Sequence, residues 1–559
     1  MIVQQEEADL VIVNATILTM NPAKPVAQAL AVQNGRFIAV GRSTEVSRRV
    51  GPKTEVWDMG GKAIVPGFND AHLHPGAVYP EDKPYARLNV GPANAPDIES
   101  LLALLRRKAE RTPKGLWVRG SGYQETKLGR HPTRYDLDKA STEHPIIISH
   151  SSGHISVCNS YALRMAKVTR DTKDPSGGVF GRDANGEPNG FLGESAAAIV
   201  RNAGPKMPEP SDEETLEGYR VCFDRYVAKG ITSIGIAGTS LSTVSTLGKL
   251  RERGWLPVRV YAMLREADIA MLEQRRRDNK LGDDWLRLGA VKIFHGNSLS
   301  GQTCWLYEPY ANRPDYFGVK PARSQTDLNV LILKIHRAGL QACVHSNGDR
   351  EIDMVLEAIE RAQRTVPRPN ARHRIEHGSI VNQKILERIK RLGVVLVPHS
   401  YTYEHGDKYE AYGEKRWNWM HPNGSAVRMG LHCAAHSDSP VSAADPMLRI
   451  QSMVTRKSEQ GKVYGPAQRV SVEQALRLWT AGGAFATFEE SQKGTIEPGK
   501  WADFAVLERD PRAVPPDALK EVAVERTVVA GKTVFERKPG SEEPAQYASV
   551  LPEWDHTDA

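Results

Sequence analysis

The chain of 559 residues has few cysteines and no long apolar run, and these absences exclude several classes of protein. Its five cysteines are an odd number, lie far apart and include no CxxC pair, so we predict neither a disulfide framework nor a zinc finger. No stretch approaches the roughly 20 apolar residues that a membrane span needs. The first residues include Glu6, Glu7 and Asp9 in place of a basic segment followed by an apolar one, so no secretory signal is expected.

A cluster of charge of one sign is also missing. The 74 Lys and Arg residues exceed the 67 Asp and Glu residues by a net charge of +7, which is spread over the whole chain. This balance does not indicate a nucleic-acid partner. The apolar content of 40% and charged content of 25% are ordinary for a globular protein with a sizeable core. We therefore expect a cytoplasmic enzyme that binds neither nucleic acid nor a membrane.

Short apolar segments at both ends of the chain predict one β domain built from the two termini. The segments are Leu10–Val13, Ala29–Val32 and Arg36–Val40 near one end, and Ala502–Leu507 and Thr527–Phe535 near the other. Turn residues separate them, and Asn34-Gly35 favours a tight hairpin. We expect residues 1–62 and 490–540 to form a discontinuous β-sandwich domain, with a polar tail over 541–559.

The centre of the chain alternates candidate strands with helical patterns. A helix is predicted over Glu213–Lys229, where apolar residues recur at helical spacing before Gly230. The candidate strands are Ala63–Phe68, Ile231–Ile236, Val258–Met263, Ala290–Phe294, Gln341–Val344, His373–Ile375, Val394–Val397 and Leu431–Ala435. Such repeated β/α units predict an α/β fold, a (β/α)8 TIM-type barrel over residues 63–76 and 213–489.

A long excursion separates the first two candidate barrel strands. Residues 77–212 contain apolar segments of their own at Trp117–Gly120 and Pro145–Ser149. We expect this stretch to be an inserted α+β domain after strand one.

The motif Asp70-Ala-His72-Leu-His74 directly follows the first candidate barrel strand. Residues i and i+2 of an extended chain point to the same side, so the two imidazoles can face one metal ion. Two solvent-exposed loop histidines are the alternative, and so short a motif does not separate the two interpretations by itself.

Further polar side chains stand at the ends of other candidate strands, where the chemistry of a β/α barrel gathers. They are Lys292 on the fourth strand, His345 after the fifth, His377 after the sixth and Asp438 after the eighth. A single core histidine is usually structural. This combination, in this order, favours a metal centre.

Through the motifs that hold these residues, the chain resembles the amidohydrolase superfamily. More narrowly it resembles the YtcJ-like branch, which includes N-substituted formamide deformylases. The likeness covers nearly the whole chain. It is carried by residues 65–74 (VPGFNDAHLH), 153–163 (GHISVCNSYAL), 345–349 (HSNGD), 373–377 (HRIEH) and 494–503 (GTIEPGKWAD).

The resemblance implies a set of ligands for one or two divalent ions, with zinc expected. These ligands are His72, His74, Lys292, His345, His377 and Asp438. Lys292 matches a lysine that many superfamily members carboxylate, which would give an N6-carboxylysine. An unmodified Lys292 paired with an acid is the alternative, because a protonated amine has no lone pair for a metal.

Two departures from the family pattern add histidines near the predicted centre. His295 follows Lys292 where relatives usually carry Asp-Gly, and His436 precedes Ser437-Asp438 where they usually carry Gly-Ser. Together with His399, these histidines could contact the substrate, tune the metal or accept hydrogen bonds from its ligands.

The activity implied is hydrolysis of a carbon–nitrogen bond other than a peptide bond, as in an amide or an N-formyl or N-acyl group. A metal-activated hydroxide would attack the carbonyl carbon, with Asp438 as general acid and base. The alternatives are ester or lactone hydrolysis, an isomerase or lyase on the same scaffold, and a non-catalytic scaffold protein.

Aromatic residues in the loops after strands four and seven favour a small-molecule substrate with an apolar or aromatic portion. Packing of a lid or a subunit contact is the alternative, with equal weight. We single out His295, Trp305 and Tyr401 of these loops as candidate substrate contacts. His154 and Glu194 match recurrent positions of the branch and could reach over the barrel mouth from the inserted domain. The resemblance further implies a homo-oligomer.

Overall fold

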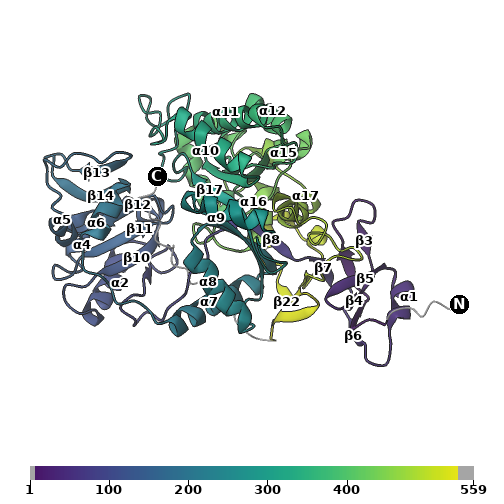
Figure 1. Cartoon of the computed structure of the whole chain (residues 1–559). Coiled ribbons are helices and arrows are strands. Elements are labelled where there is room, and N and C mark those ends of the chain that lie inside the picture. Colours follow the sequence, from purple (N-terminus) through teal and green to yellow (C-terminus); the bar gives the residue numbers. More distant parts are fainter. Residues whose placement is uncertain (1–6, 539–559) are drawn as a thin grey trace.

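A computed structural model describes residues 7–538, so the tail predicted over 541–559 lies outside the described residues. Three regions lie side by side in Figure 1: the segment after the first barrel strand on the left, a parallel barrel in the centre, and two sheets from the ends of the chain on the right. The fold is mixed α/β.

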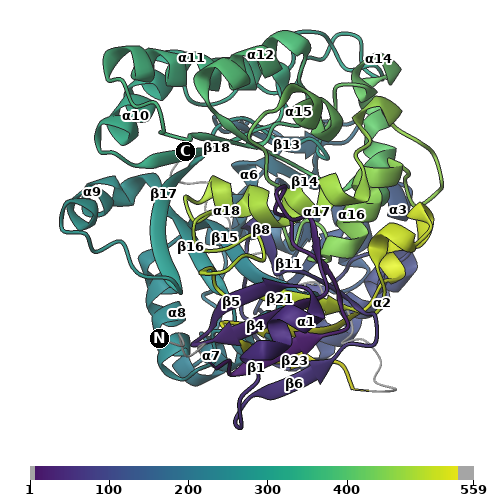
Figure 2. The same ribbon diagram turned by 90° about the vertical axis from the view of Figure 1, so that its right-hand side faces the viewer.

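The ends of the chain form the two sheets on the right, which Figure 2 views from the front; the first contains strands from the N-terminal end only, and the second contains strands from both ends. The first has the order β5-β4-β1-β6, and the second has the order β23-β22-β21-β7-β2-β3. Their strands are β1 (Leu10–Val13), β2 (Thr16–Leu18), β3 (Val26–Ala27), β4 (Ala29–Gln33), β5 (Arg36–Gly41), β6 (Glu55–Asp58), β7 (Ala63–Pro66), β21 (Phe504–Leu507), β22 (Val524–Val529) and β23 (Lys532–Glu536). Helix α1 (Ser43–Val46) follows β5.

The predicted pairing of the two termini is confirmed by β7 and β21, which run antiparallel with Ala63 opposite Leu507. Apolar side chains from both sheets, such as Leu30 and Phe504, form one buried core. The predicted hairpin is also confirmed: Asn34 and Gly35 connect β4 to β5 with φ of 50° and 73°. A tight hairpin turn needs these positive φ values, which asparagine and glycine adopt readily.

The central sheet is a nearly closed barrel of seven parallel strands in the order β20-β19-β18-β17-β16-β15-β8. Its strands are β8 (Phe68–Leu73), β15 (Ile231–Thr239), β16 (Arg259–Leu264), β17 (Leu286–Phe294), β18 (Gln341–Ser346), β19 (Arg374–His377) and β20 (Val395–Pro398). Most of their residues are buried, because helices cover one face and barrel side chains fill the other; such strands appear in the sequence as continuous apolar runs. The strands predicted between Ile231 and Val397 are therefore confirmed.

The two edge strands of this sheet both bond to the segment 432–438. The Leu396 amide of β20 donates to the His432 carbonyl at 3.0 Å. On the other side, the Ala71 amide of β8 donates to the Ala435 carbonyl at 3.2 Å, and the Asp438 amide donates to the His72 carbonyl at 3.0 Å. These bonds fix Asp438 beside the end of β8.

Helices surround the barrel or lie in the loops at its mouth. They are α7 (Asp212–Val227), α8 (Leu241–Glu252), α9 (Ile269–Arg277), α10 (Gln325–Arg337), α11 (Asp349–Thr365), α12 (Gln383–Leu392), α13 (Thr402–His405), α14 (Glu414–Trp417), α15 (Asn423–Met429), α16 (Pro446–Thr455), α17 (Val472–Arg477) and α18 (Gly483–Ala486). The predicted helix is confirmed as α7. It begins after Ser211, whose hydroxyl accepts a hydrogen bond from the Glu214 amide in a capping box.

The segment after β8 forms its own six-stranded sheet with the order β13-β14-β12-β11-β10-β9. Its strands are β9 (Leu88–Asn89), β10 (Val118–Tyr123), β11 (Ile146–His150), β12 (Ile155–Cys158), β13 (Gly178–Arg182) and β14 (Pro188–Glu194). Its helices are α2 (Ile98–Arg111), α3 (Glu125–Leu128), α4 (Arg134–Asp138), α5 (Ser160–Met165) and α6 (Ala196–Asn202). Apolar clusters on its two faces are separate from the barrel core.

The strand predicted over Ala63–Phe68 as the first of the barrel is wrong in its boundaries. The chain leaves the terminal sheet at Pro66 and enters the barrel at Phe68. Gly67 makes the change of sheet, and a Cβ at this residue would lie 2.0 Å from the Thr232 Oγ1 atom. Only glycine lets the backbone pass this closely to β15.

We expect Gly67→Ala to destabilise the protein by about 1–3 kcal/mol, because a methyl group would be forced against the buried and stiff Thr232 side chain. Urea unfolding measures the change. The matched control is Gly248→Ala in α8, where a Cβ would have open space; that change should raise stability by up to about 1 kcal/mol. Equal effects at the two positions would contradict the argument.

All five cysteines are buried free thiols. In the described part of the chain, no helix is both long enough and apolar enough to cross a bilayer.

Candidate metal centre

The predicted ligands gather at one mouth of the barrel. They are His72 on β8, His74 directly after it, Lys292 on β17, His345 on β18, His377 at the end of β19, and Asp438 beyond the segment that bonds both edge strands. None is more than 6% exposed. Side chains separated by hundreds of residues thus meet in one buried place, because the ends of parallel strands converge there.

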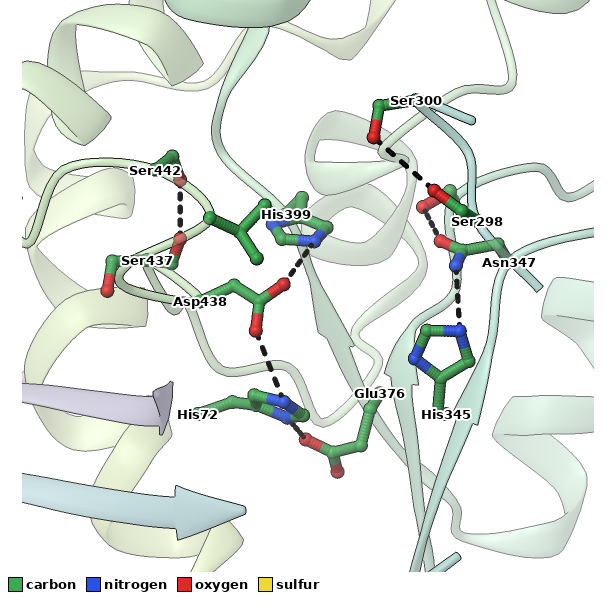
Figure 3. Close-up of polar contacts among 12 residues, drawn as sticks. His72, Ser298, Ser300, His345, Asn347, Glu376, His399, Ser437, Asp438 and Ser442 are labelled. Atoms are coloured by element: carbon green, nitrogen blue, oxygen red, sulfur yellow. Dashed lines mark hydrogen bonds and ion pairs between the residues drawn. The ribbon is translucent and has the colours of Figure 1, made fainter. Parts of the chain in front are cut away.

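Asp438 lies between two sets of histidines, as Figure 3 shows for His72 and His399. Its Oδ1 atom is 3.2 Å from Nε2 of His74 and 3.4 Å from Nε2 of His72. Its Oδ2 atom is 3.3 Å from Nε2 of His399. Burial acts to raise the pKa of Asp438, but neighbouring histidines such as His377 hold it well below its usual value. The side chain is a carboxylate.

His72 is oriented by a buried acid that the sequence analysis missed. Its Nδ1 atom donates to Glu376 Oε2, and Glu376 accepts two hydrogen bonds of 2.7 Å from the Arg374 guanidinium. All three side chains are fully buried. Because Nδ1 carries the proton, Nε2 of His72 presents its lone pair to the interior of the site. Arg374 and Glu376 lie two residues apart on β19, so their side chains point to the same face of the strand. This spacing in the sequence is the signal that could have indicated the ion pair.

Lys292 occupies the side of His72 that faces β17. Its Nζ atom is 3.2 Å from Nε2 of His72. Burial is the main effect that lowers the pKa of this amine, to about 8. The lysine therefore contacts the predicted ligands directly.

His345 and His377 lie side by side, with ring centroids 4.6 Å apart, but they face different partners. Nε2 of His345 lies 3.1 Å from the Asn297 carbonyl and 3.2 Å from Nδ2 of Asn347. His377 has a φ of 72° and its Nδ1 atom has no hydrogen-bond partner among the described residues. Burial is the main effect that lowers the pKa of both imidazoles well below the usual value.

Two of the three additional histidines, His399 and His436, lie in one cluster with the predicted ligands. The His399 ring stacks on that of His377 at 4.6 Å, and the His436 ring is 4.3 Å from that of His399. His295 is not among the described residues that line the cavity at the cluster. Within the described chain, two groups of three residues have ligand atoms within 4.8 Å of one another. The groups are His72, His377 and Asp438, and His377, His399 and His436.

The cluster opens into a cavity with about 270 Å³ of empty space. Its lining is mostly polar and consists of Ser152, His154, Ser298, Leu299, Ser300, His345, Asn347, His377, His399, Tyr401, Asp438 and Val441. A larger cavity, with about 1140 Å³ of space that includes open solvent, shares Val441 with it and has a more apolar wall, which includes Pro92, Tyr226 and Pro440.

The segment after β8 contributes directly to the smaller cavity. His154 lines it, and its Nδ1 atom is 2.8 Å from Glu194 Oε2. Burial acts to lower the pKa of His154, but the Glu194 carboxylate outweighs it and the pKa is raised. Glu194 also accepts a hydrogen bond of 3.1 Å from the Thr303 hydroxyl. The two predicted residues thus form a pair at the barrel mouth.

Of the two aromatic candidates, the structure places one at the cavity. Tyr401 lines it, with its ring 4.1 Å from that of His399. Trp305 instead stacks against Arg350, whose guanidinium carbon is 3.7 Å from the ring centroid. Most other rings of these loops pack together in one cluster, including Tyr310, Tyr316, Tyr409, Tyr412 and Trp417. The packing alternative therefore accounts for these rings.

Glu351 is a second buried acid that the sequence analysis missed. Its carboxylate accepts hydrogen bonds from the amides of Asn297, Trp305, Asn347 and Gly348, at 2.7 to 3.1 Å. It thereby joins the loop after β17 to the loop after β18. Its position in the first turn of α11 is the visible signal for a capping role.

Comparisons with known proteins agree with this geometry. Residues 55–535 match the model of the amidohydrolase family. The YtcJ protein of Bacillus subtilis (strain 168) is 30% identical over 521 residues, which cover 91% of this chain and 96% of that protein. The N-substituted formamide deformylase of Arthrobacter pascens is 28% identical, with 95% and 98% covered. A solved metal-dependent hydrolase from Pyrococcus horikoshii OT3 superposes with a TM-score of 0.70 at 25% identity, covering 91% of this chain and 99% of that one.

Proposed function

The chain belongs to the amidohydrolase family, and from this premise we propose that it is a metal-dependent hydrolase that cleaves the carbon–nitrogen bond of a small amide. The observation that carries the proposal is the place of Asp438, a buried carboxylate between the imidazoles of His72, His74 and His399 on one side of a small cavity. The amide as substrate class is supported by the likeness to the formamide deformylase.

The donor set fits a divalent transition metal. Neutral imidazoles and a carboxylate are the ligands that zinc and related ions prefer. The ligand atoms of His72, His377 and Asp438 lie within 4.8 Å of one another, so these three side chains can reach one ion. We propose His72, His74, His345, His377 and Asp438 as the ligand set, with zinc as the ion. When bound, the ion supplies an acidified water molecule and polarises the carbonyl group of the substrate.

In this proposal Asp438 carries out the proton transfers. Its carboxylate accepts the proton of the attacking water and then delivers it to the leaving nitrogen, which departs as an amine. The carbon–oxygen bond forms as the carbon–nitrogen bond breaks, so the products are an acid and an amine. His154, held by Glu194 at 2.8 Å, is proposed to donate a hydrogen bond to the substrate carbonyl region from the opposite wall.

Lys292 is proposed as an N6-carboxylysine. A carbamate at this position would replace a buried ammonium, 3.2 Å from His72 Nε2, by anionic oxygens that can ligate a cation. The surrounding imidazoles would then contact a ligand instead of a competing positive charge.

The two cavities support a particular shape of substrate. The small polar cavity suits an acyl group as small as formyl, and the larger, more apolar cavity beyond Val441 suits an apolar substituent on the nitrogen. We therefore propose an N-substituted formamide or a similar short-chain N-acyl amine.

We also propose the domain arrangement that this function needs. The segment 431–438 acts as the eighth barrel strand, since it bonds to β20 and to β8. The two terminal sheets, which share one core, act as a β-sandwich domain, and residues 77–212 act as the inserted domain that covers the site.

Removal of divalent ions is expected to lower hydrolysis by at least about 100-fold, because the electrostatic stabilisation of the reacting carbonyl is lost. The measurement compares chelator-treated protein, before and after zinc is restored, on N-formyl and N-acetyl amines with matched esters and lactones. The proposal predicts that zinc restores turnover and that the N-formyl amines react fastest. Turnover that survives chelation, or a preference for the esters, would contradict it.

A further inference from the structure

Ser152 lines the small cavity and stands at the end of a buried chain of hydrogen bonds. Its hydroxyl oxygen is 2.8 Å from Nδ1 of His150, and Nε2 of His150 is 2.7 Å from Glu125 Oε2. The other oxygen of Glu125 accepts from Lys408, which lies in the 3-10 helical segment Gly406–Tyr412 after β20. The side chains of His150 and Lys408 are buried. The chain of bonds therefore joins the segment after β8 to a loop of the barrel.

The acid in this chain determines which nitrogen of His150 carries the proton. Burial acts to raise the pKa of Glu125, but His150 and Lys408 outweigh it and the pKa is lowered. Glu125 is thus a carboxylate, which can only accept, so the proton of His150 lies on Nε2. The backbone amide of Ser152, which can only donate, faces Nδ1 at 3.1 Å. Nδ1 of His150 therefore presents a lone pair to Ser152.

The hydroxyl group of Ser152 has a fixed polarity as a result. A hydroxyl group has one hydrogen and two lone pairs. The hydrogen is donated to Nδ1 of His150, and one lone pair accepts the backbone amide of His154 at 3.2 Å. The second lone pair remains for the cavity. Ser152 thus offers an acceptor beside the imidazole of His154, which also lines the cavity.

We propose that Ser152 recognises the N–H group of a secondary amide substrate, with His150 and Glu125 as positioning residues that turn the hydroxyl hydrogen away from the cavity. The inference rests on the proposed function and narrows its substrate class to amides that keep an N–H group. An ester of the same carbon skeleton has an oxygen lone pair where the amide has the N–H group. Two acceptors would then face each other, so the cavity should disfavour the ester.

The test compares an N-alkyl formamide with the formate ester of the same carbon skeleton, on the zinc-loaded full-length protein. We expect Ser152→Ala to lower kcat/KM for the amide about tenfold, by loss of one hydrogen bond, and to change kcat/KM for the ester by less than about twofold. The measured quantity is the amide-to-ester ratio of kcat/KM, because the intrinsic reactivities of the two substrates cancel when variants are compared. A purely structural role would lower both values equally and leave the ratio unchanged.

Glu125→Gln tests the chain of bonds at a residue that is not among the described residues lining the cavity. The buried Lys408 ammonium needs the one remaining oxygen, so the glutamine NH2 group would face Nε2 of His150. The imidazole proton would then be favoured on Nδ1, and the Ser152 hydroxyl would turn its hydrogen toward the cavity. The amide-to-ester ratio should fall at least as far as in Ser152→Ala.

The matched control is Ser149→Ala, on the same strand as His150. The Ser149 hydroxyl is 3.3 Å from that of Ser156, and Ser149 is not one of the described residues around the cavity. This variant should keep both wild-type values of kcat/KM. Circular dichroism and zinc content verify every variant, and Ser152→Ala decides alone if Glu125→Gln does not fold.

The outcomes separate this inference from the proposed function. An unchanged ratio in Ser152→Ala overturns the inference, even if the enzyme hydrolyses the amide as proposed. A lower ratio in Ser152→Ala with the wild-type ratio in Glu125→Gln also overturns it, because the hydroxyl would then act without its positioning residues.

Hydrolysis of the ester alone would overturn the proposed function, and inhibition of ester turnover by the amide then replaces the ratio. Weaker inhibition of Ser152→Ala than of wild type would uphold the inference, and equal inhibition would overturn it. A chain that hydrolyses neither substrate overturns both.

Discussion

Asp438→Asn is expected to lower kcat for amide hydrolysis by about 10²–10⁴-fold, the usual contribution of a positioned general acid and base. Asparagine has nearly the same shape but cannot accept the proton of the attacking water. The backbone φ of Asp438 is 58°. Asparagine adopts this conformation readily, so the substitution should not disturb the backbone. KM should change less than kcat, because proton transfer takes place after the substrate has bound.

Metal content must be measured on the same sample, since Asp438 is also a proposed ligand. Loss of activity with the ion retained assigns the effect to proton transfer, whereas loss of both assigns it to ligation. Asp97→Asn is the matched control, an isosteric change at the N-cap of α2, where asparagine caps as well as aspartate. Full activity in Asp438→Asn would contradict the proposed role of Asp438 as general acid and base.

The barrel was predictable because its strands are buried on both faces. Runs such as Val258–Met263 contain little but apolar residues, and the helices between them show their own periodicity. The boundary at Gly67 did have a signal in the sequence. Pro66-Gly67 interrupts the apolar run between Ala63 and Phe68, and this pair of residues is typical of a turn, so the run divides into two strands at the point where the chain changes sheets.

The candidate ligands were predictable from their positions at strand ends, but their partners were not. Glu376 bonds to His72 across 304 residues of sequence, and a glutamate beside an arginine on a strand usually indicates a solvated pair. Loop residues were the least predictable: His295 and Trp305 carry no periodicity, and their backbone path decides that neither lines the cavity. His399 and His436 were noticed only as departures from a pattern, since their proximity depends on the register between neighbouring strand ends.

Glu376→Gln is expected to weaken zinc binding by about 10- to 100-fold, the usual effect of removing a carboxylate that orients a ligating histidine. Glutamine has one acceptor oxygen in place of two, so its NH2 group would face a donor, either Nε of Arg374 or Nδ1 of His72. A bond from His72 to a neutral amide oxygen is also weaker than its bond to the carboxylate, so the proton of His72 is held less firmly on Nδ1. Competition with a chromophoric chelator measures the affinity.

The same change should lower the free energy of unfolding by about 3–5 kcal/mol, because it leaves the fully buried Arg374 guanidinium without its counter-charge. The control is Glu490→Gln, which breaks an arginine–glutamate pair with Arg372 near the opposite end of β19, where Glu490 is 42% exposed. That pair should be worth less than about 1 kcal/mol, and zinc affinity should not change. If Glu376→Gln lowered stability but left zinc affinity at the wild-type value, the acid would support the barrel core and not the orientation of His72.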